Sequence, residues 1–123
     1  MNQAKLIGNL GADPVIKTGA NGKPFAQFSV ATKEQWVDKQ TSQPREDVQW
    51  HQIAVFDAKL VEFAQQHLRK GSFVNIEGSI RNARYTDAGG NERFSSQIVV
   101  SGPRARLTLQ ESRQTNEAGR GGR

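Results

Sequence analysis

The chain has 123 residues and carries 17 Lys and Arg against 12 Asp and Glu, a formal net charge of +5. A chain of this length encloses one modest hydrophobic core, so we expect a single folded domain. The basic balance favours a polyanionic partner, such as nucleic acid or an anionic membrane surface. No cysteine is present, which excludes disulfide scaffolds, thiolate metal ligands and thiol nucleophiles.

The two ends of the chain differ in character. Residues 1–8 contain no apolar run as long as a signal peptide or a membrane span, so we expect a soluble cytoplasmic protein without membrane contact. Residues 1–100 hold 12 basic and 10 acidic side chains, a net +2, whereas residues 101–123 hold 5 and 2, a net +3. Residues 111–123 have no large apolar side chain and end in Gly-Arg-Gly-Gly-Arg. We therefore predict a folded domain over residues 1–110 and a disordered basic tail over residues 111–123.

The first half of the folded part has the patterns of strands. Lys5 to Leu10 is a short apolar run, and Asn21-Gly22 is a hairpin-type turn signal. From Ala26 to Thr32 the residues alternate with the period of a strand. The polar segment Asp38 to Asp47 is expected to be a long flexible hairpin loop, and Val48 to Phe56 a third strand.

After this third strand the period changes to that of a helix. Asp57 is placed to cap the start of the helix, and Gly71 to end it. Four apolar residues recur at helical spacing on one face: Leu60, Phe63, Ala64 and Leu68.

Strand patterns return in the last part of the domain. Phe73 to Tyr85 and Arg93 to Val100 are predicted strands joined by a turn at Asp87 to Asn91, and Gly102-Pro103 interrupts or bends the second of them. Three further residues could continue the sheet: Ala105, Leu107 and Leu109.

The order of three strands, one helix and two strands predicts the fold class. It fits an all-β domain with one helix, namely a five-stranded Greek-key barrel of the OB-fold type. An SH3-like barrel and an open α+β sheet are the structural alternatives. Because a fold does not by itself license a function, the function must come from particular side chains.

The strand faces opposite the apolar stripes carry large aromatic side chains. In the strand Val48 to Phe56, alternation sets Trp50 and Phe56 on the face opposite the apolar residues. In the following strand, Tyr85 shares the polar face with Arg81. Trp36 is expected at the base of the polar hairpin, flanked by lysines.

Aromatic rings in basic surroundings are the composition of a platform for unstacked nucleobases. Nearby Lys and Arg side chains would neutralise phosphates. The predicted stacking residues are Trp36, Trp50, Phe56 and Tyr85. The predicted phosphate-contacting residues are Lys33, Lys39, Arg45, Lys59, Lys70, Arg81 and Arg84.

Simpler interpretations compete with this one. A single tryptophan on a strand is more often packed in a core or interface than used as a platform, so Trp50 alone would decide nothing. His51 lies on the inward face and His67 on the helix, with no third ligand, so no metal site is expected. No phosphate-loop lysine follows Gly8 to Gly11, and no spacing supports a catalytic triad. We therefore expect a non-catalytic protein without a cofactor.

Several motifs resemble those of bacterial single-stranded DNA-binding proteins. The opening Ile7-Gly8-Asn9-Leu10-Gly11-Ala12-Asp13-Pro14 resembles the start of that family. The later motifs follow in the family's order, and the whole set covers nearly all of residues 5–100. Those motifs are Phe28-Ser29-Val30-Ala31-Thr32, Trp50-His51, Val55-Phe56, Lys59-Leu60, Leu68-Arg69-Lys70-Gly71 and Ile76-Glu77-Gly78. The ordered set is far more specific than any one of its pieces.

This resemblance implies an OB-fold, usually a homotetramer, that wraps single-stranded DNA in replication, recombination and repair and is associated with the nucleoid. It assigns stacking roles to the four aromatic residues named above, with Tyr85 at a position where tryptophan is common. His51 matches a position associated with the subunit interface. Ala83 stands where some members have a basic residue, so that contact would be missing.

The end of the chain departs from the family pattern. Members commonly end in a linker and a short acidic tip that recruits other genome-maintenance proteins, whereas this sequence ends in basic residues. Such partners are therefore expected only if the natural chain is longer. Two other OB-type interpretations stay open: a primosomal replication-restart protein that acts mainly through protein contacts, and an RNA-binding domain.

Overall fold

The computed structural model describes residues 1–110, except the side chains of Ala83 and Tyr85. The predicted tail, residues 111–123, lies outside the described residues. Within the described part, seven strands and one helix follow in chain order: β1 (Ala4–Leu10), β2 (Val15–Thr18), β3 (Pro24–Val37), β4 (Pro44–Val55), α1 (Ala58–His67), β5 (Phe73–Thr86), β6 (Glu92–Val100) and β7 (Arg106–Leu109).

Five of these strands close into a barrel, as predicted. The strands pair in the order β1-β3-β4-β6-β5, and β1 also pairs with β5, which closes the circle. The closed circle decides against an open sheet and bears out the OB-type barrel. The strand β2 pairs with β3 and was not predicted, whereas β7 pairs with β5 where the sequence suggested a continuation.

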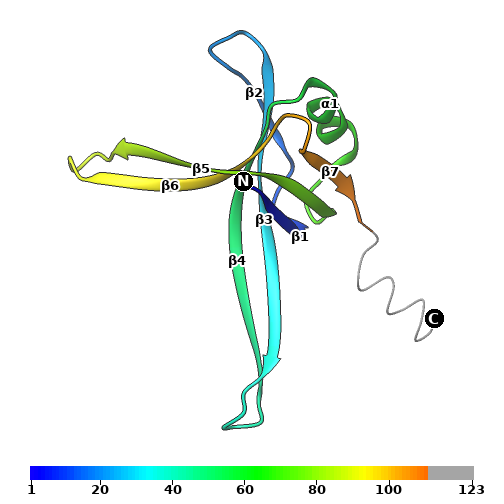
Figure 1. Ribbon diagram of the computed structural model, residues 1–123, viewed down its shortest axis with the longest axis vertical. Coiled ribbons are helices and arrows are strands. Elements are labelled where there is room, and N and C mark those ends of the chain that lie inside the picture. Colours follow the sequence, from blue (N-terminus) through cyan, green and yellow to red (C-terminus); the bar gives the residue numbers. More distant parts are fainter. Residues whose placement is uncertain (111–123) are drawn as a thin grey trace.

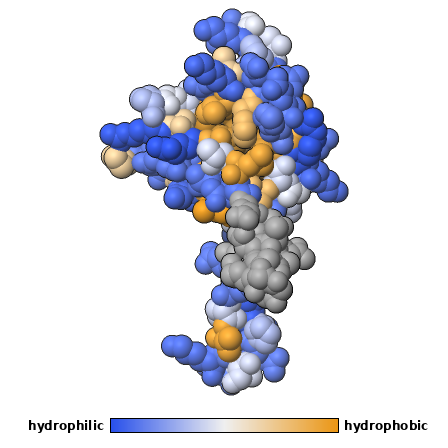
Figure 2. Space-filling model, turned by 90° about the vertical axis from the view of Figure 1, so that its right-hand side faces the viewer, coloured by the Kyte–Doolittle hydropathy of each residue, from blue (hydrophilic) through white to orange (hydrophobic). Residues whose placement is uncertain are grey.

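The barrel interior is filled by side chains from the inward faces of the strands, which are aliphatic except for Phe28 of β3. In the barrel part of β4, Ile53 and Val55 are buried, whereas Trp50 on the opposite face and Phe56 directly after the strand are exposed. Ala54 departs from this alternation, because it has the parity of Trp50 and is nevertheless buried. The helix adds Val61 and Ala64 to this core, and Leu68, directly after the helix, is also buried in it. In the view of Figure 2, hydrophobic side chains gather over the barrel, whereas the visible end of the β3–β4 hairpin is mostly hydrophilic with one hydrophobic patch.

Two hairpins extend from the barrel as two-stranded arms in different directions (Figure 1). The β3–β4 arm corrects the sequence-based loop: residues 44–47 belong to β4, and the connecting turn is confined to residues 38–43. These residues are strand because they pair with residues 34–37 across the ribbon, a long-range pairing that their polar composition does not reveal. Trp36 therefore lies near the tip of the arm and not at its base.

The helix begins as predicted but ends earlier. The Asp57 carboxylate accepts hydrogen bonds from the backbone N–H groups of Lys59 and Leu60, at 3.0 and 3.2 Å. The helix ends at His67, and Leu68 is already extended. Gly71, with a φ of 89°, lies in the turn that follows, where its N–H donates to the carbonyl of Leu10. Its role is to turn the chain into β5, not to cap the helix.

Closure of the barrel brings backbones into close approach at Gly8. A β carbon at this position would overlap the carbonyl oxygen of Ala31 and lie 2.9 Å from its carbonyl carbon. Both strands are held on their other sides, because Gly8 is paired with Val74 of β5 and Ala31 with Trp50 of β4. The missing side chain of Gly8 is therefore a condition for closure.

Replacing Gly8 by Ala should lower the free energy of unfolding by about 1–3 kcal/mol, because the added carbon forces closely packed backbones apart. Urea denaturation monitored by circular dichroism measures the loss. The control is Gly89→Ala, where an added β carbon meets only side-chain atoms at 3.5 Å and the change should stay within about 0.5 kcal/mol. Equal stability of the two variants would contradict the closure argument.

The tip of the β5–β6 arm is organised by one carboxylate. Asp87 Oδ1 accepts from the N–H groups of Gly89 and Asn91, at 3.0 and 2.9 Å, and Oδ2 accepts from Arg93 Nε at 2.9 Å. The hydrogen bond from Arg93, together with those from the backbone, lowers the pKa of Asp87 below that of an ordinary aspartate.

The lowered pKa makes the order of this turn depend on pH. Because the folded-state pKa is depressed, its stabilising contribution is present above the pKa of an unfolded aspartate and is lost as the pH falls through the folded value. An NMR titration of the Asp87 carboxyl carbon should show this low midpoint, and Arg93→Gln should raise it. Arg106→Gln, on β7, is the control. An unchanged midpoint in the Arg93 variant would exclude the guanidinium as the cause.

Candidate nucleic-acid interface

Four adjacent strands of the barrel, β3, β4, β6 and β5, share a continuous outward face. Register joins Ser29, Gln52, Gln97 and Arg81 in one row across these strands. Trp50, opposite Ala31, stands one outward position further along β4. We call this curved surface, the outward-pointing residues of the four strands, the outer wall. It unites positions that are more than fifty residues apart in the sequence.

Trp50 is a large exposed aromatic side chain of the outer wall. It is 59% exposed, which contradicts the core-packing interpretation of this residue. Lys33 lies on the same face, diagonal to Trp50, because its direct cross-strand partner is Val48. An accessible indole with a nearby ammonium group combines a stacking surface with a phosphate contact.

Phe56 stands on the same side of β4, just beyond the end of the strand. Its ring stacks on Phe25, with a centroid distance of 5.1 Å and an interplanar angle of 22°. Phe56 is nevertheless 47% exposed, so the pair presents a second aromatic surface. Sequence reasoning missed Phe25, although its place in the outward alternation of β3, directly after Pro24, is a signal that could have indicated it.

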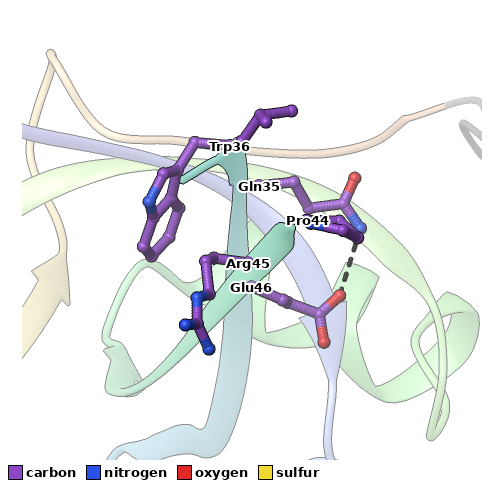
Figure 3. Close-up of a pocket in the computed structure, with 6 residues that line it drawn as sticks. Gln35, Trp36, Pro44, Arg45 and Glu46 are labelled. Carbon is purple, nitrogen blue, oxygen red and sulfur yellow. Dashed lines mark hydrogen bonds between the residues drawn. The ribbon is translucent and has the colours of Figure 1, made fainter. Parts of the chain in front are cut away.

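Trp36 does not share the outer wall with Trp50. It pairs with Arg45, and alternation from this pair puts both on the face of the β3–β4 ribbon opposite Trp50. Figure 3 shows Trp36 and Arg45 on one side of the ribbon and Gln35 and Glu46 on the other, where Gln35 Nε2 donates to Glu46 Oε1 at 3.1 Å. Trp36 is 50% exposed and lines an open pocket near the tip. The predicted aromatic set is thus divided between two faces.

Two further predicted residues, Arg84 and Tyr85, lie on the β5–β6 arm. The backbone of Tyr85 pairs with that of Arg93, and its side chain lies outside the described part of the structure. Arg84 lies over the ring of Phe94, 5.3 Å from the centroid, and Nε is 3.4 Å from a carboxylate oxygen of Glu92. Sequence reasoning missed Phe94, which is 66% exposed. Phe94 lies on the same face of β6 as the core residues Ile98 and Val100. That face is buried inside the barrel but is exposed to solvent where β6 extends beyond the barrel into the arm.

The predicted basic residues are distributed over several elements. All seven are exposed, but two of them, Arg45 and Arg84, form ion pairs with Asp38 and Glu92. Lys39 lies in the turn of the β3–β4 arm, Lys59 in the first turn of α1, and Lys70 in the turn after the helix. Only Lys33 and Arg81 lie on the outer wall.

His51 lies on the inward face of β4 and is half-buried. Its Nε2 is 2.9 Å from the hydroxyl oxygen of Thr32, which is a hydrogen-bond distance. Among residues 1–110, no three His, Asp or Glu side chains are grouped so that they could hold a metal ion. No helix in that part of the chain is long and apolar enough to cross a membrane.

Comparisons with known proteins agree with this geometry. A single-stranded DNA-binding protein of Rhizobium meliloti (strain 1021) is 37% identical over 121 residues, which are 98% of this chain and 70% of that protein. A solved structure described as Plasmodium falciparum SSB in complex with ssDNA superposes with a TM-score of 0.82 at 31% identity, over 90% of this chain and 96% of that one. The model of the Single-strand binding protein family matches residues 1–110. The chain therefore belongs to the single-strand binding protein family.

Proposed function

We propose that this protein binds single-stranded DNA without sequence specificity and protects it during replication, recombination and repair. The observation that carries this proposal is the exposed indole of Trp50 on the outer wall, with Lys33 beside it and Arg81 two strands away. The family membership and the name of the Rhizobium meliloti relative support the same conclusion.

The chemistry of these groups suits an unpaired strand. Every nucleobase has a π-face, so stacking tolerates any sequence and contributes about 1–3 kcal/mol per base. Trp50 and the Phe25–Phe56 pair supply two such surfaces, six residues apart along β4. The spacing is about 20 Å along the strand, which leaves room for several nucleotides between them.

The charged groups add a contribution that depends on salt. Lys33 and Arg81 contact phosphates in this proposal, and each neutralised phosphate releases counterions. Trp36 with Arg45 offers a further contact on the other face of the β3–β4 arm. A single DNA strand that contacts both Trp36 and Trp50 therefore has to pass around this arm. The proposed activity is a binding equilibrium that needs no catalytic group and no cofactor. We propose the cytoplasm, in association with the nucleoid, as the location of the protein.

Replacing Trp50 by Ala should weaken the binding of oligo-dT roughly 5- to 150-fold, which corresponds to the loss of one stacked base. Fluorescence anisotropy of a labelled oligomer at several salt concentrations measures the affinity. The thermal midpoint should change little, because the indole is exposed.

The matched control is Leu109→Ala, an exposed apolar side chain on β7, outside the outer wall. It should leave the affinity unchanged. Absence of oligo-dT binding by the folded wild-type protein at low salt would refute the proposed function. A Trp50 variant that is unfolded would assign the indole to packing.

We also propose that the protein assembles as a homotetramer. The pairing of β1 with β3 is restricted to Asn9 and Leu10, so within the described structure the β3-facing edge of β1 from Ala4 to Gly8 has no partner strand. An open strand edge of this kind is a template for pairing with a second chain. Ile7 on the same strand is 44% exposed.

One buried polar atom supports the same assembly. Asn75 pairs with Ile7 across β5 and β1, and its buried Oδ1 has no hydrogen-bond partner within the described structure. A donor from a second copy would satisfy this oxygen. The half-buried His51 is the other position that we assign to a subunit interface.

Sedimentation velocity at micromolar concentration should show a species of four chain masses. His51→Lys should shift the distribution towards smaller species, because a charged side chain at an interface loses its hydration. Lys17→Ala, on the exposed part of β2, is the control and should not change the distribution. A wild-type protein that sediments as a monomer would contradict the assembly.

A further inference from the structure

The indole of Trp50 lies over a row of small residues. Its cross-strand partner is Ala31, and Ser29 is the next outward residue of β3. Beyond β3 lies Gly11, whose N–H donates to the carbonyl of Ser29 at 3.0 Å. The ring therefore leans across β3, and its far edge reaches the backbone of Gly11.

The fit between the indole and Gly11 leaves no room for a side chain. A β carbon on Gly11 would lie 2.6 Å from Cζ3 and 3.0 Å from Cη2 of Trp50, and 3.0 Å from the hydroxyl oxygen of Ser29. Gly11 does not have a positive φ, unlike Gly22, Gly71, Gly90 and Gly102. The backbone at Gly11 thus permits any residue, and it is the ring of Trp50 that requires glycine there.

The backbone around Gly11 cannot move away from the indole. Leu10 donates to the carbonyl of Ser72 at 3.0 Å and accepts from Gly71 at 2.9 Å. On the other side of Gly11, the carboxylate of Asp13 accepts from the N–H of Lys70 at 2.8 Å. With both flanks fixed, an added side chain has to displace the exposed ring, which can swing into solvent.

We propose that Gly11 is a positioning residue for the base-stacking platform. Its missing side chain lets the indole of Trp50 lie down on β3, so that one face of the ring is supported and the other faces solvent. An indole held in this way loses little freedom when a base stacks on it. The inference rests on the proposed function for its effect on DNA, but the position of the ring is independent of DNA.

The first test measures the ring without DNA. In a Trp36→Phe background, Trp50 is the only tryptophan, because the chain contains two. Gly11→Ala should shift its emission to longer wavelength and increase its quenching by acrylamide. The glycine control is Gly89→Ala, at the tip of the other arm, which should change neither. Unchanged emission and quenching in the Gly11 variant would overturn the proposal, whatever the protein binds.

The second test is a double-mutant cycle on oligo-dT affinity. Gly11→Ala should weaken binding roughly three- to tenfold when Trp50 is present, which is part of the value of one stacked base. In the Trp50→Ala background the same change should cost less than about twofold, because the displaced ring is no longer there. Equal losses in both backgrounds would show that Gly11 acts independently of Trp50 and would overturn the proposal.

A stability measurement covers the case in which Gly11→Ala folds poorly. If the ring is the cause, the Gly11→Ala, Trp50→Ala double variant recovers the thermal midpoint of Trp50→Ala. If the backbone is the cause, the double variant stays destabilised and the positioning role is refuted. A wild-type protein that does not bind oligo-dT would refute the proposed function, and the emission test would still decide the position of the ring.

Discussion

Closure of the barrel through β1 is the constraint on which the rest of the molecule depends. This strand pairs with β5 along most of its length and reaches β3 only at its end. The passage is narrow, because the backbone of Gly8 lies against the carbonyl of Ala31. Once the barrel is closed, the inward faces of its strands are packed against one another in the hydrophobic core and are not accessible to a ligand. Any ligand must therefore be met by outward side chains, by the arms or by the strand ends.

The strand that closes the barrel also prepares the candidate interface. The chain leaves β1 at Leu10 and passes beside β3, where Gly11 lies beneath the indole of Trp50. Hydrogen bonds from the turn after α1 hold this passage in place. Closure, the helix and the aromatic platform are thus mechanically linked. This link explains how an indole that is 59% exposed has a defined position on the surface.

The arms divide the aromatic and basic groups among separate surfaces. Trp50 and Phe56 stay on the outer wall, whereas Trp36 and Arg45 lie on the opposite face of the β3–β4 ribbon. On the other arm, Arg84 is engaged with Phe94 and Glu92. A basic residue that already has a partner contributes less to a new phosphate contact, since the first ion pair must be given up. The position of each basic side chain and its existing partners therefore say more about its contribution to phosphate binding than the total number of basic residues does.

Short-range physics made much of this protein predictable from its sequence. The Asp57 cap and the turns at Asn21-Gly22 and residues 87–91 depend on neighbouring residues, and the structure agrees with each. The alternation along β4 also depends on neighbours, and it holds in the barrel except at Ala54, which is buried. The register between distant strands is different, because it is set by closure of the whole barrel. Only the tertiary structure could place Gly11 beneath Trp50, stack Phe25 on Phe56 and turn Trp36 to the other face. The net charge of +5 indicated a polyanionic partner, but the positions of two of its charges, Lys33 and Arg81 on the outer wall, were decided by strand pairing.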